Sequence, residues 1–437
     1  MSRNTRGLEL PELRVGTAQL EISPPLEVGL LMSSVERRWS PFVGQRAPLH
    51  ARALVLEQGE QRCALLSLDL LGLSSKAVGG WAEFKRAIGR RAGPGWSSDR
   101  FVIACTHTHT APDSLALSTL HQLPAFRQWI SSLSHKLSQV LSRASAATRP
   151  CTLEFASTTL PGYWIQRRIP TAEGIALSDR FQPIPPSWLD REPVDRRVRT
   201  LQFRERSGEI LATVVHAACH PVNEMCLPYI SPDYPGALCE ALSSETNHGL
   251  VMFLNGASAD LNPLTVSEGP GASVRQGRAL ASAVEASLSG ARPIPYFAAS
   301  WGQMTSLLPM RTLAGTPSRR HCRARLNLLA MGSVALLFLP GEIFVETGRA
   351  IEASSPFEHT LIVGYSEDSV GYVTPPRVLR EGGYEAGPGR WAYLATDAEP
   401  QLRHAAQGLL EQLSRGYGRQ RARNVSHKGT KLTKLPS

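Results

Sequence analysis

The sequence predicts an α/β protein in which mixed β-sheets flanked by helices form one large domain. Three observations predict this class. Short β-rich runs alternate with amphipathic helical segments along the chain. Several of the β-rich runs are apolar throughout, which indicates strands covered on both faces. No repeat period and no clear linker interrupts the chain before residue 415, so we expect one domain over residues 14–414 and a tail over residues 415–437.

Nine runs have the length and residue types of β-strands. The clearest is VALLFLP at 334–340, which is apolar at every position and is therefore expected to be buried on both faces. The predicted strands are residues 52–57, 63–69, 101–106, 151–156, 199–204, 210–215, 250–255, 325–332 and 334–340.

Five segments are predicted as helices. The longest carries Phe126, Trp129 and Leu133 at helical spacing, which forms a stripe that faces the core. Pro235 marks the beginning of another helix. The predicted helices are residues 76–91, 125–146, 235–246, 272–289 and 399–414. The Pro-rich stretch 160–198 has no periodicity, so we expect a long functional or mobile loop there.

The composition is that of a soluble globular protein, with 42% hydrophobic and 19% charged residues among 437. No apolar run is long enough for a transmembrane helix. The first residues, MSRNTRGLELPELRVG, contain no secretory signal, so the expected location is cytoplasmic. Seven cysteines without a CxxC pair favour free thiols over a disulfide framework.

The net charge of +10 comes mostly from the tail. Residues 415–437 contain seven Lys or Arg and no acid, whereas the remainder holds 40 basic and 37 acidic residues. We expect the tail to be disordered and solvated, with contact to an anionic membrane surface as the alternative. No aromatic residues alternate with the basic ones and no nucleic-acid motif is present, so no nucleic-acid partner is predicted.

Two histidines follow the predicted strand 101–106, within the segment CTHTHTAP. Residues i and i+2 of an extended chain point to the same side, so the imidazoles of His107 and His109 are expected to face one pocket. A metal ion needs such converging neutral nitrogens. Two histidines satisfied by ordinary packing are the alternative.

Further candidates follow other predicted strands. His216 and His220 lie on one face if their strand continues, or His220 lies in a turn imposed by Pro221. Glu342 follows Pro-Gly at the end of an apolar strand. A carboxylate buried there needs a partner, which is a cation or, alternatively, an arginine or a helix N-terminus.

Other residues in loops are less specific. Asp260 and Asn262 line a site or form a turn, and tyrosines of the Gly-rich segment 364–389 are usually packing or hydrogen-bonding residues. The sequence lacks a GxSxG elbow, a P-loop and an HExxH motif. Two histidines and one glutamate on separate strand ends are together typical of a catalytic zinc with an open coordination position.

The chain resembles the catalytic domain of the neutral, non-lysosomal ceramidase family. The motifs VGTAQLEISPPLEVGLL, THTHTAP, ACHPVN, ISPDYPG, FLNGASADLNP, LPGE and GYVTPP followed by GGYE occur in that family's order over roughly residues 14–414. The resemblance implies zinc-dependent hydrolysis of an N-acyl amide, ceramide or a related N-acyl lipid, by a zinc-activated water. It therefore also implies a role in lipid and sphingolipid metabolism.

The resemblance also implies roles for individual residues. The zinc ligands are expected to be His107, His220, Glu342 and Tyr372. His109 is expected to act as a proton or oxyanion partner beside the metal, and Arg167 and Tyr384 as hydrogen-bond donors in the pocket. The twelve-residue spacing of the two tyrosines is the one found in the family.

The sequence departs from the family in three ways. Asn262 stands where ceramidases have a serine, and an asparagine donates a hydrogen bond but is no nucleophile. We further expect a short form of the family, without the secretory signal and without the C-terminal immunoglobulin-like domain. Two other functions are therefore alternatives: a zinc hydrolase of an ester or phosphoester, and a non-catalytic lipid-binding homologue.

Overall fold

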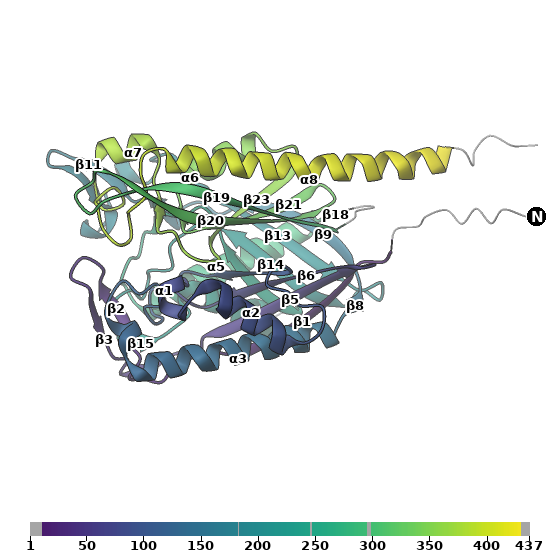
Figure 1. The fold of residues 1–437 in the computed structure, drawn as a ribbon, viewed down its shortest axis with the longest axis horizontal. Coiled ribbons are helices and arrows are strands. Elements are labelled where there is room, and N and C mark those ends of the chain that lie inside the picture. The colour runs from purple at the N-terminus through teal and green to yellow at the C-terminus, as the bar shows by residue number, and fades with distance from the viewer. Residues whose placement is uncertain (1–10, 182, 245–246, 295–298, 430–437) are drawn as a thin grey trace, which may run out of the picture.

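The computed structural model describes residues 11–181, 183–244, 247–294 and 299–429 of the chain. Two β-sheets pack face to face, and helices cover the outer face of each (Figure 1). The predicted α/β class with mixed sheets flanked by helices is confirmed.

The larger sheet has nine strands of mixed direction. Strands β6 and β7 are parallel, as are β21 and β23, whereas the other pairs are antiparallel. In spatial order the strands are β19 (Ala299–Arg311), β20 (Pro317–Met331), β21 (Val334–Pro340), β23 (His359–Ser366), β7 (Phe101–Cys105), β6 (Gln61–Leu68), β5 (His50–Gln58), β1 (Arg14–Glu21) and β8 (Arg149–Pro150).

The smaller sheet has five strands, and five two-stranded ladders surround the pair of sheets. The strands of the smaller sheet are, in spatial order, β16 (Leu250–Asn255), β14 (Ile210–Ala217), β13 (Arg197–Arg204), β9 (Thr152–Thr159) and β18 (Arg292–Pro293). The ladders pair β2 (Leu30–Ser33) with β3 (Arg38–Ser40), β4 (Gly44–Gln45) with β15 (Tyr229–Ile230), β10 (Trp164–Gln166) with β17 (Leu261–Pro263), β11 (Arg168–Thr171) with β12 (Gly174–Leu177), and β22 (Glu342–Ile343) with β24 (Tyr372–Val373).

The helices form the two outer layers (Figure 1). They are α1 (Ser75–Val78), α2 (Trp81–Ala92), α3 (Pro124–Ala146), α4 (Asp233–Ser244), α5 (Pro270–Leu288), α6 (Val345–Ala353), α7 (Pro376–Glu381) and α8 (Ala398–Gly429). Helices α2 and α3 pack on one part of the larger sheet and α6 and α8 on another, while α4 and α5 pack on the smaller sheet. None of the helices in the described ranges is long and apolar enough to cross a membrane.

The core follows from the alternation of side chains along the strands. In β21 every residue is buried. Leu336 and Phe338 lie between the two sheets, whereas Leu337 and Leu339 pack against the layer of α6 and α8. This alternation confirms that the strand predicted at 334–340 is covered on both faces, and each such leucine stabilises the fold by roughly 1.5–3 kcal/mol.

Several predicted boundaries differ from the structure. The helix expected at 76–91 is divided into α1 and α2, because Gly79 and Gly80 have φ values of 76° and 117°. The stretch 160–198 contains the short strands β10, β11 and β12, so it is not a single loop. Its strands are only three or four residues long, which is too short for periodicity to reveal.

The C-terminal segment also differs from its prediction. Helix α8 continues to Gly429, so the segment from residue 415 to 429, which we expected to be disordered, is helical. Its Arg, Gln and Ala residues are good helix formers, and residues 415–429 contain no proline. Residues 430–437 lie outside the described residues, and the membrane contact considered as the alternative to a solvated tail is not tested.

Candidate metal centre

Four strands end at the same place, and the residues that follow them form the candidate site. His107 follows β7, His220 follows β14, Ser258 follows β16, and Glu342 follows β21. Strands β7 and β23 meet at their C-terminal residues, where Ser366 pairs with Ala104. The positions predicted at strand ends are thus brought together from distant parts of the chain.

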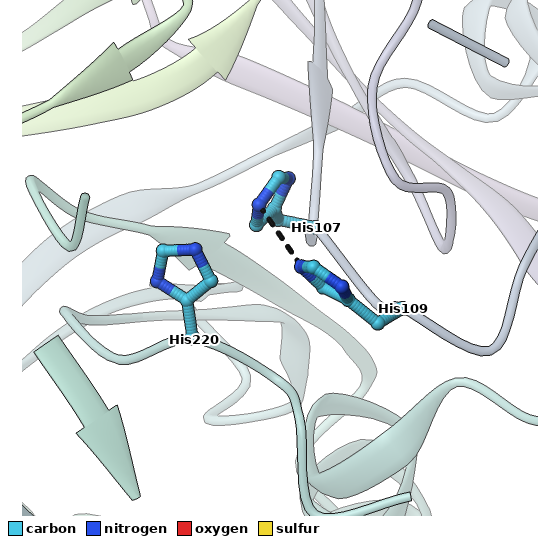
Figure 2. A group of neighbouring side chains, drawn as sticks. All are labelled: His107, His109 and His220. Carbon is cyan, nitrogen blue, oxygen red and sulfur yellow. Dashed lines mark hydrogen bonds between the residues drawn. The ribbon is translucent and has the colours of Figure 1, made fainter. Parts of the chain in front are cut away.

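His107 and His109 face each other, although not for the reason predicted. Strand β7 ends at Cys105, and His107 has a φ of 71°, in the left-handed region. The alternation of an extended chain therefore does not apply to the pair. The two rings meet edge to face with their centroids 4.9 Å apart, and their Nε2 atoms are 3.4 Å apart (Figure 2).

His220 completes a group of three histidines. The nearest ring nitrogens of His107, His109 and His220 all lie within 4.8 Å of one another. Figure 2 shows the three rings arranged around a common centre. Such a group could hold a metal ion through one nitrogen of each ring.

Backbone carbonyl groups determine the tautomers of two of these rings. The carbonyl oxygen of Leu71 accepts a hydrogen bond from Nδ1 of His107, and that of Ser258 accepts one from Nδ1 of His220 at 2.7 Å. A carbonyl oxygen only accepts, so each ring carries its hydrogen on Nδ1 and its acceptor lone pair on Nε2. The contact between the Nε2 atoms of His107 and His109 then requires the hydrogen on Nε2 of His109.

Glu342 places a carboxylate against the two lone pairs. Its Oε2 lies 3.5 Å from Nε2 of His107 and 3.3 Å from Nε2 of His220. This oxygen is buried and has no hydrogen-bond partner in the described part of the chain. Gly341, with a φ of 85°, allows the close turn before Glu342, because a Cβ atom there would lie 2.3 Å from the carbonyl oxygen of Gly371.

The charges in the site favour a cation. Burial holds the pKa values of His107 and His220 well below the usual histidine value, so both rings are neutral and neither forms an ion pair with the carboxylate. Burial also raises the pKa of Glu342, against the opposing effects of His107 and Arg167. Two nitrogen lone pairs and one oxygen thus converge without a hydrogen between them, and this donor set fits a divalent metal ion.

Tyr372 lies beside Glu342, because the two residues are paired in the parallel ladder of β22 and β24. Arg167 follows β10 and donates from its terminal nitrogens to Nε2 of His220 at 3.2 Å and to the hydroxyl of Tyr372 at 2.9 Å. Its Nε donates to Glu385 at 2.8 Å. A metal ion on the same Nε2 atom has to displace the first of these bonds, whereas the bond to Glu385 would keep the arginine in place.

Tyr384 and Asn262 lie on other segments around the site. The ring of Tyr384 makes an edge contact with Tyr372, with centroids 6.0 Å apart, and its hydroxyl is 2.8 Å from Oγ of Ser34. Burial raises the pKa of Tyr384 to about 12, so it is a hydrogen-bond donor at neutral pH. Asn262 is buried in β17, and its Oδ1 has no partner among the described residues. Its Nδ2 is 3.5 Å from Oγ of Ser178.

His216, the other histidine considered from the sequence, does not join the group. It lies within β14, where its Nδ1 contacts Arg199 at 3.2 Å and its Nε2 contacts the carbonyl oxygen of Ile362 at 2.7 Å. Burial and the Arg199 guanidinium lower the pKa of His216 to about 3. This histidine is a neutral core residue, and it does not share the pocket of His220.

Sequence reasoning did not identify two residues that hold the rings. The carbonyl oxygens of Leu71 and Ser258 accept the Nδ1 hydrogens described above. A backbone carbonyl carries no signature of this role in the sequence, so no pattern would have revealed it. Tyr365, which stacks on His107, was visible only as one of several tyrosines in a Gly-rich segment.

Comparison with known proteins identifies solved structures with a similar fold. No family model and no curated protein matches the sequence. Among solved structures, a neutral ceramidase from Pseudomonas aeruginosa is similar, with a TM-score of 0.74 and 17% identity over 94% of this chain and 75% of that chain. A structure described as ceramidase complexed with C2 is similar to the same degree, with a TM-score of 0.74 and 16% identity over 94% of this chain and 76% of that chain. The resemblance noted in the sequence is thus confirmed at the level of the fold.

Proposed function

We propose that this protein is a zinc-dependent amidohydrolase that cleaves an N-acyl amide, ceramide or a related N-acyl lipid. One observation carries the proposal. The buried Oε2 of Glu342 has no hydrogen-bond partner in the described ranges and faces the Nε2 lone pairs of two neutral histidines. The likeness of the fold to neutral ceramidases supports the reaction class.

The proposed ligands are His107, His220, Glu342 and Tyr372. When bound, Zn²⁺ supplies Lewis-acid activation of water for attack on the amide carbonyl carbon. The tautomers support this assignment, because each carbonyl partner orients its ring and increases the basicity of the free nitrogen. His109 lies in the same group, and we assign it to the substrate and not to the metal.

The remaining residues have roles that follow from their protonation. Arg167 and Tyr384 are hydrogen-bond donors and would stabilise negative charge that develops on the carbonyl oxygen. Burial and the neighbouring His220 and Arg167 hold the pKa of His109 well below its usual value. A metal ion on Nε2 of His107 would remove the contact that holds the hydrogen on Nε2 of His109. The neutral His109 ring would then be free to accept a proton from water and to transfer it to the leaving amine. Asn262 would hydrogen-bond the substrate beside the scissile bond.

The test combines metal analysis with a panel of substrates. We expect the purified protein to contain zinc, and the zinc-loaded protein to release fatty acid from N-acyl lipids faster than from acyl esters or phosphate esters. A protein that contains no zinc, and that shows no amidase activity when zinc is added, would refute the proposal. Hydrolysis confined to esters or phosphoesters would support that alternative class instead.

Two histidine variants test the division of roles. We expect His107→Ala to lose zinc, and His109→Ala to keep zinc but to lose rate. His135→Ala is the matched control, because His135 is exposed on α3 and should change neither property. Loss of zinc in both site variants would show that His109 is a ligand. The cytoplasmic location stays a prediction.

A further inference from the structure

Tyr365 lies directly against the candidate metal ligands. Its ring is stacked on that of His107, with centroids 4.0 Å apart and planes inclined by 21°. Its backbone N–H donates to the carbonyl oxygen of Gly341 at 2.9 Å, immediately before Glu342. Tyr365 has a φ of 53°, a backbone conformation that is strained for a bulky residue and that often marks a functional site.

The hydroxyl of Tyr365 leads to the second histidine. Ser258 donates from Oγ to Oδ1 of Asn255 at 3.1 Å, so its Oγ is free to accept from the Tyr365 hydroxyl at 2.8 Å. The backbone carbonyl of the same serine accepts the Nδ1 hydrogen of His220 at 2.7 Å. Tyr365 therefore contacts His107 with its ring face and reaches His220 through a single residue.

Asn255 links the segments that carry the two histidines. Its Nδ2 donates to the carbonyl oxygens of Thr106 at 3.0 Å and Cys219 at 3.1 Å, the residues immediately before His107 and His220. Its Oδ1 accepts from Oγ of Ser258 and from the backbone N–H of Cys219. Both donors and the acceptor of the amide are used, and only one orientation of the amide allows this.

We infer that Tyr365 is a positioning residue that, through Ser258 and Asn255, sets the relative placement of the His107 and His220 rings and so the affinity of the site for Zn²⁺. This inference rests on the proposed function. Its physical basis is that residues which orient metal ligands typically change metal affinity by about 10- to 100-fold when they are lost. No other described side chain both stacks on one of the two rings and hydrogen-bonds the residue that holds the other.

The test is the dissociation constant for Zn²⁺, measured on the metal-free protein by competition with a chelator. We expect Tyr365→Phe, which retains the ring but loses the hydroxyl, to weaken zinc binding about 10-fold. Ser258→Ala should weaken it to a similar degree, and the double variant no further, because both changes remove the same hydrogen bond. Tyr365→Leu, which also removes the stacked ring, should weaken it more, toward about 100-fold.

The matched control is Tyr393→Phe, which removes a hydroxyl whose contact is with Sγ of Cys322 at 3.8 Å. It should leave the dissociation constant unchanged. Thermal unfolding of the metal-free variants distinguishes a purely structural role from an effect on metal binding. If Tyr365→Phe and Ser258→Ala lower the melting temperature but bind Zn²⁺ within twofold of wild type, the inference is wrong. Wild-type protein that binds no Zn²⁺ would instead refute the proposed function, and the inference with it.

Discussion

A buried ion pair between Lys85 and Glu367 offers a strong test of how the core is packed. Lys85 of α2 donates from Nζ to both carboxylate oxygens of Glu367, at 2.7 and 2.8 Å, and to the carbonyl oxygen of Phe101 at 2.7 Å. Glu367 also accepts from Nε1 of Trp81 at 3.3 Å and from the backbone N–H of Ile103 at 3.2 Å. The pair thus joins α2 to β7 and to the segment after β23.

The expected loss in the free energy of unfolding depends on which charged group each substitution leaves unpaired in the core. Both side chains are at most 1% exposed. Lys85→Met therefore leaves a buried carboxylate with two neutral donors, and removal of one partner of a buried pair costs about 3–5 kcal/mol. Glu367→Gln leaves a buried ammonium group and should cost a similar amount. The double variant holds no charge, so we expect it to lose only about 1–2 kcal/mol, the value of the missing hydrogen bonds.

The assay is equilibrium urea unfolding followed by far-UV circular dichroism. Arg90→Met is the matched control, because Arg90 lies on the same helix and pairs with Glu83 at 2.9 Å, but with side chains 61% and 58% exposed. A pair in water contributes little, so the control should unfold like wild type. The reasoning is refuted if Lys85→Met costs no more than Arg90→Met, or if the double variant loses the sum of the two single changes.

Three further predictions concern other parts of the molecule. Although burial opposes it, the neighbouring arginines lower the pKa of Asp195 from 3.8 to about 2, so its carboxylate stabilises the fold by about 2.5 kcal/mol above pH 4. That contribution is lost as the pH falls to 2, and Asp195→Asn should flatten the acid limb of a urea-unfolding series. Gly341→Ala should lower the melting temperature and abolish zinc binding, because its Cβ would lie 2.3 Å from a carbonyl oxygen. The control is Gly208→Ala, where φ is 95° and the added Cβ meets open space. It should lower the melting temperature by a smaller amount and leave zinc binding unchanged. Asn255→Ala should cost about 3 kcal/mol in urea unfolding because it leaves the buried carbonyl oxygen of Thr106 without a donor and the backbone N–H of Cys219 without an acceptor. By contrast, Asn262→Ala should cost less than about 1 kcal/mol because that amide has one marginal contact; equal losses would contradict the hydrogen bonding described here.

Much of the fold was predictable because its strands are apolar runs of ordinary length. The run at 334–340 became a strand buried on both faces, and the stripe of Phe126, Trp129 and Leu133 became the buried face of α3. By contrast, β10, β11 and β12 are three or four residues long. Pairing with other segments, and not local periodicity, makes them strands, so they were missed.

The candidate site was predictable in part for a similar reason. Motifs in a family-specific order indicated His107, His220 and Glu342, and all three lie together in the structure. Strand alternation alone did not separate His216 from His220, because four residues on a possible strand place both on one face. The structure separates them, since β14 ends at Ala217 and only His216 remains within it.

Residue type and apolar runs are local properties, so the sequence alone showed which side chains could bind a metal and that each follows a strand. The nitrogen that each ring presents became known only from the fold. Those choices depend on the carbonyl oxygens of Leu71 and Ser258, which lie 36 and 38 residues from the rings they hold. The left-handed turn at His107, and not the alternation of side chains along a strand, likewise brings its ring against that of His109. Hydrogen bonds between distant segments, and not the spacing of the histidines, therefore make the group a candidate metal centre.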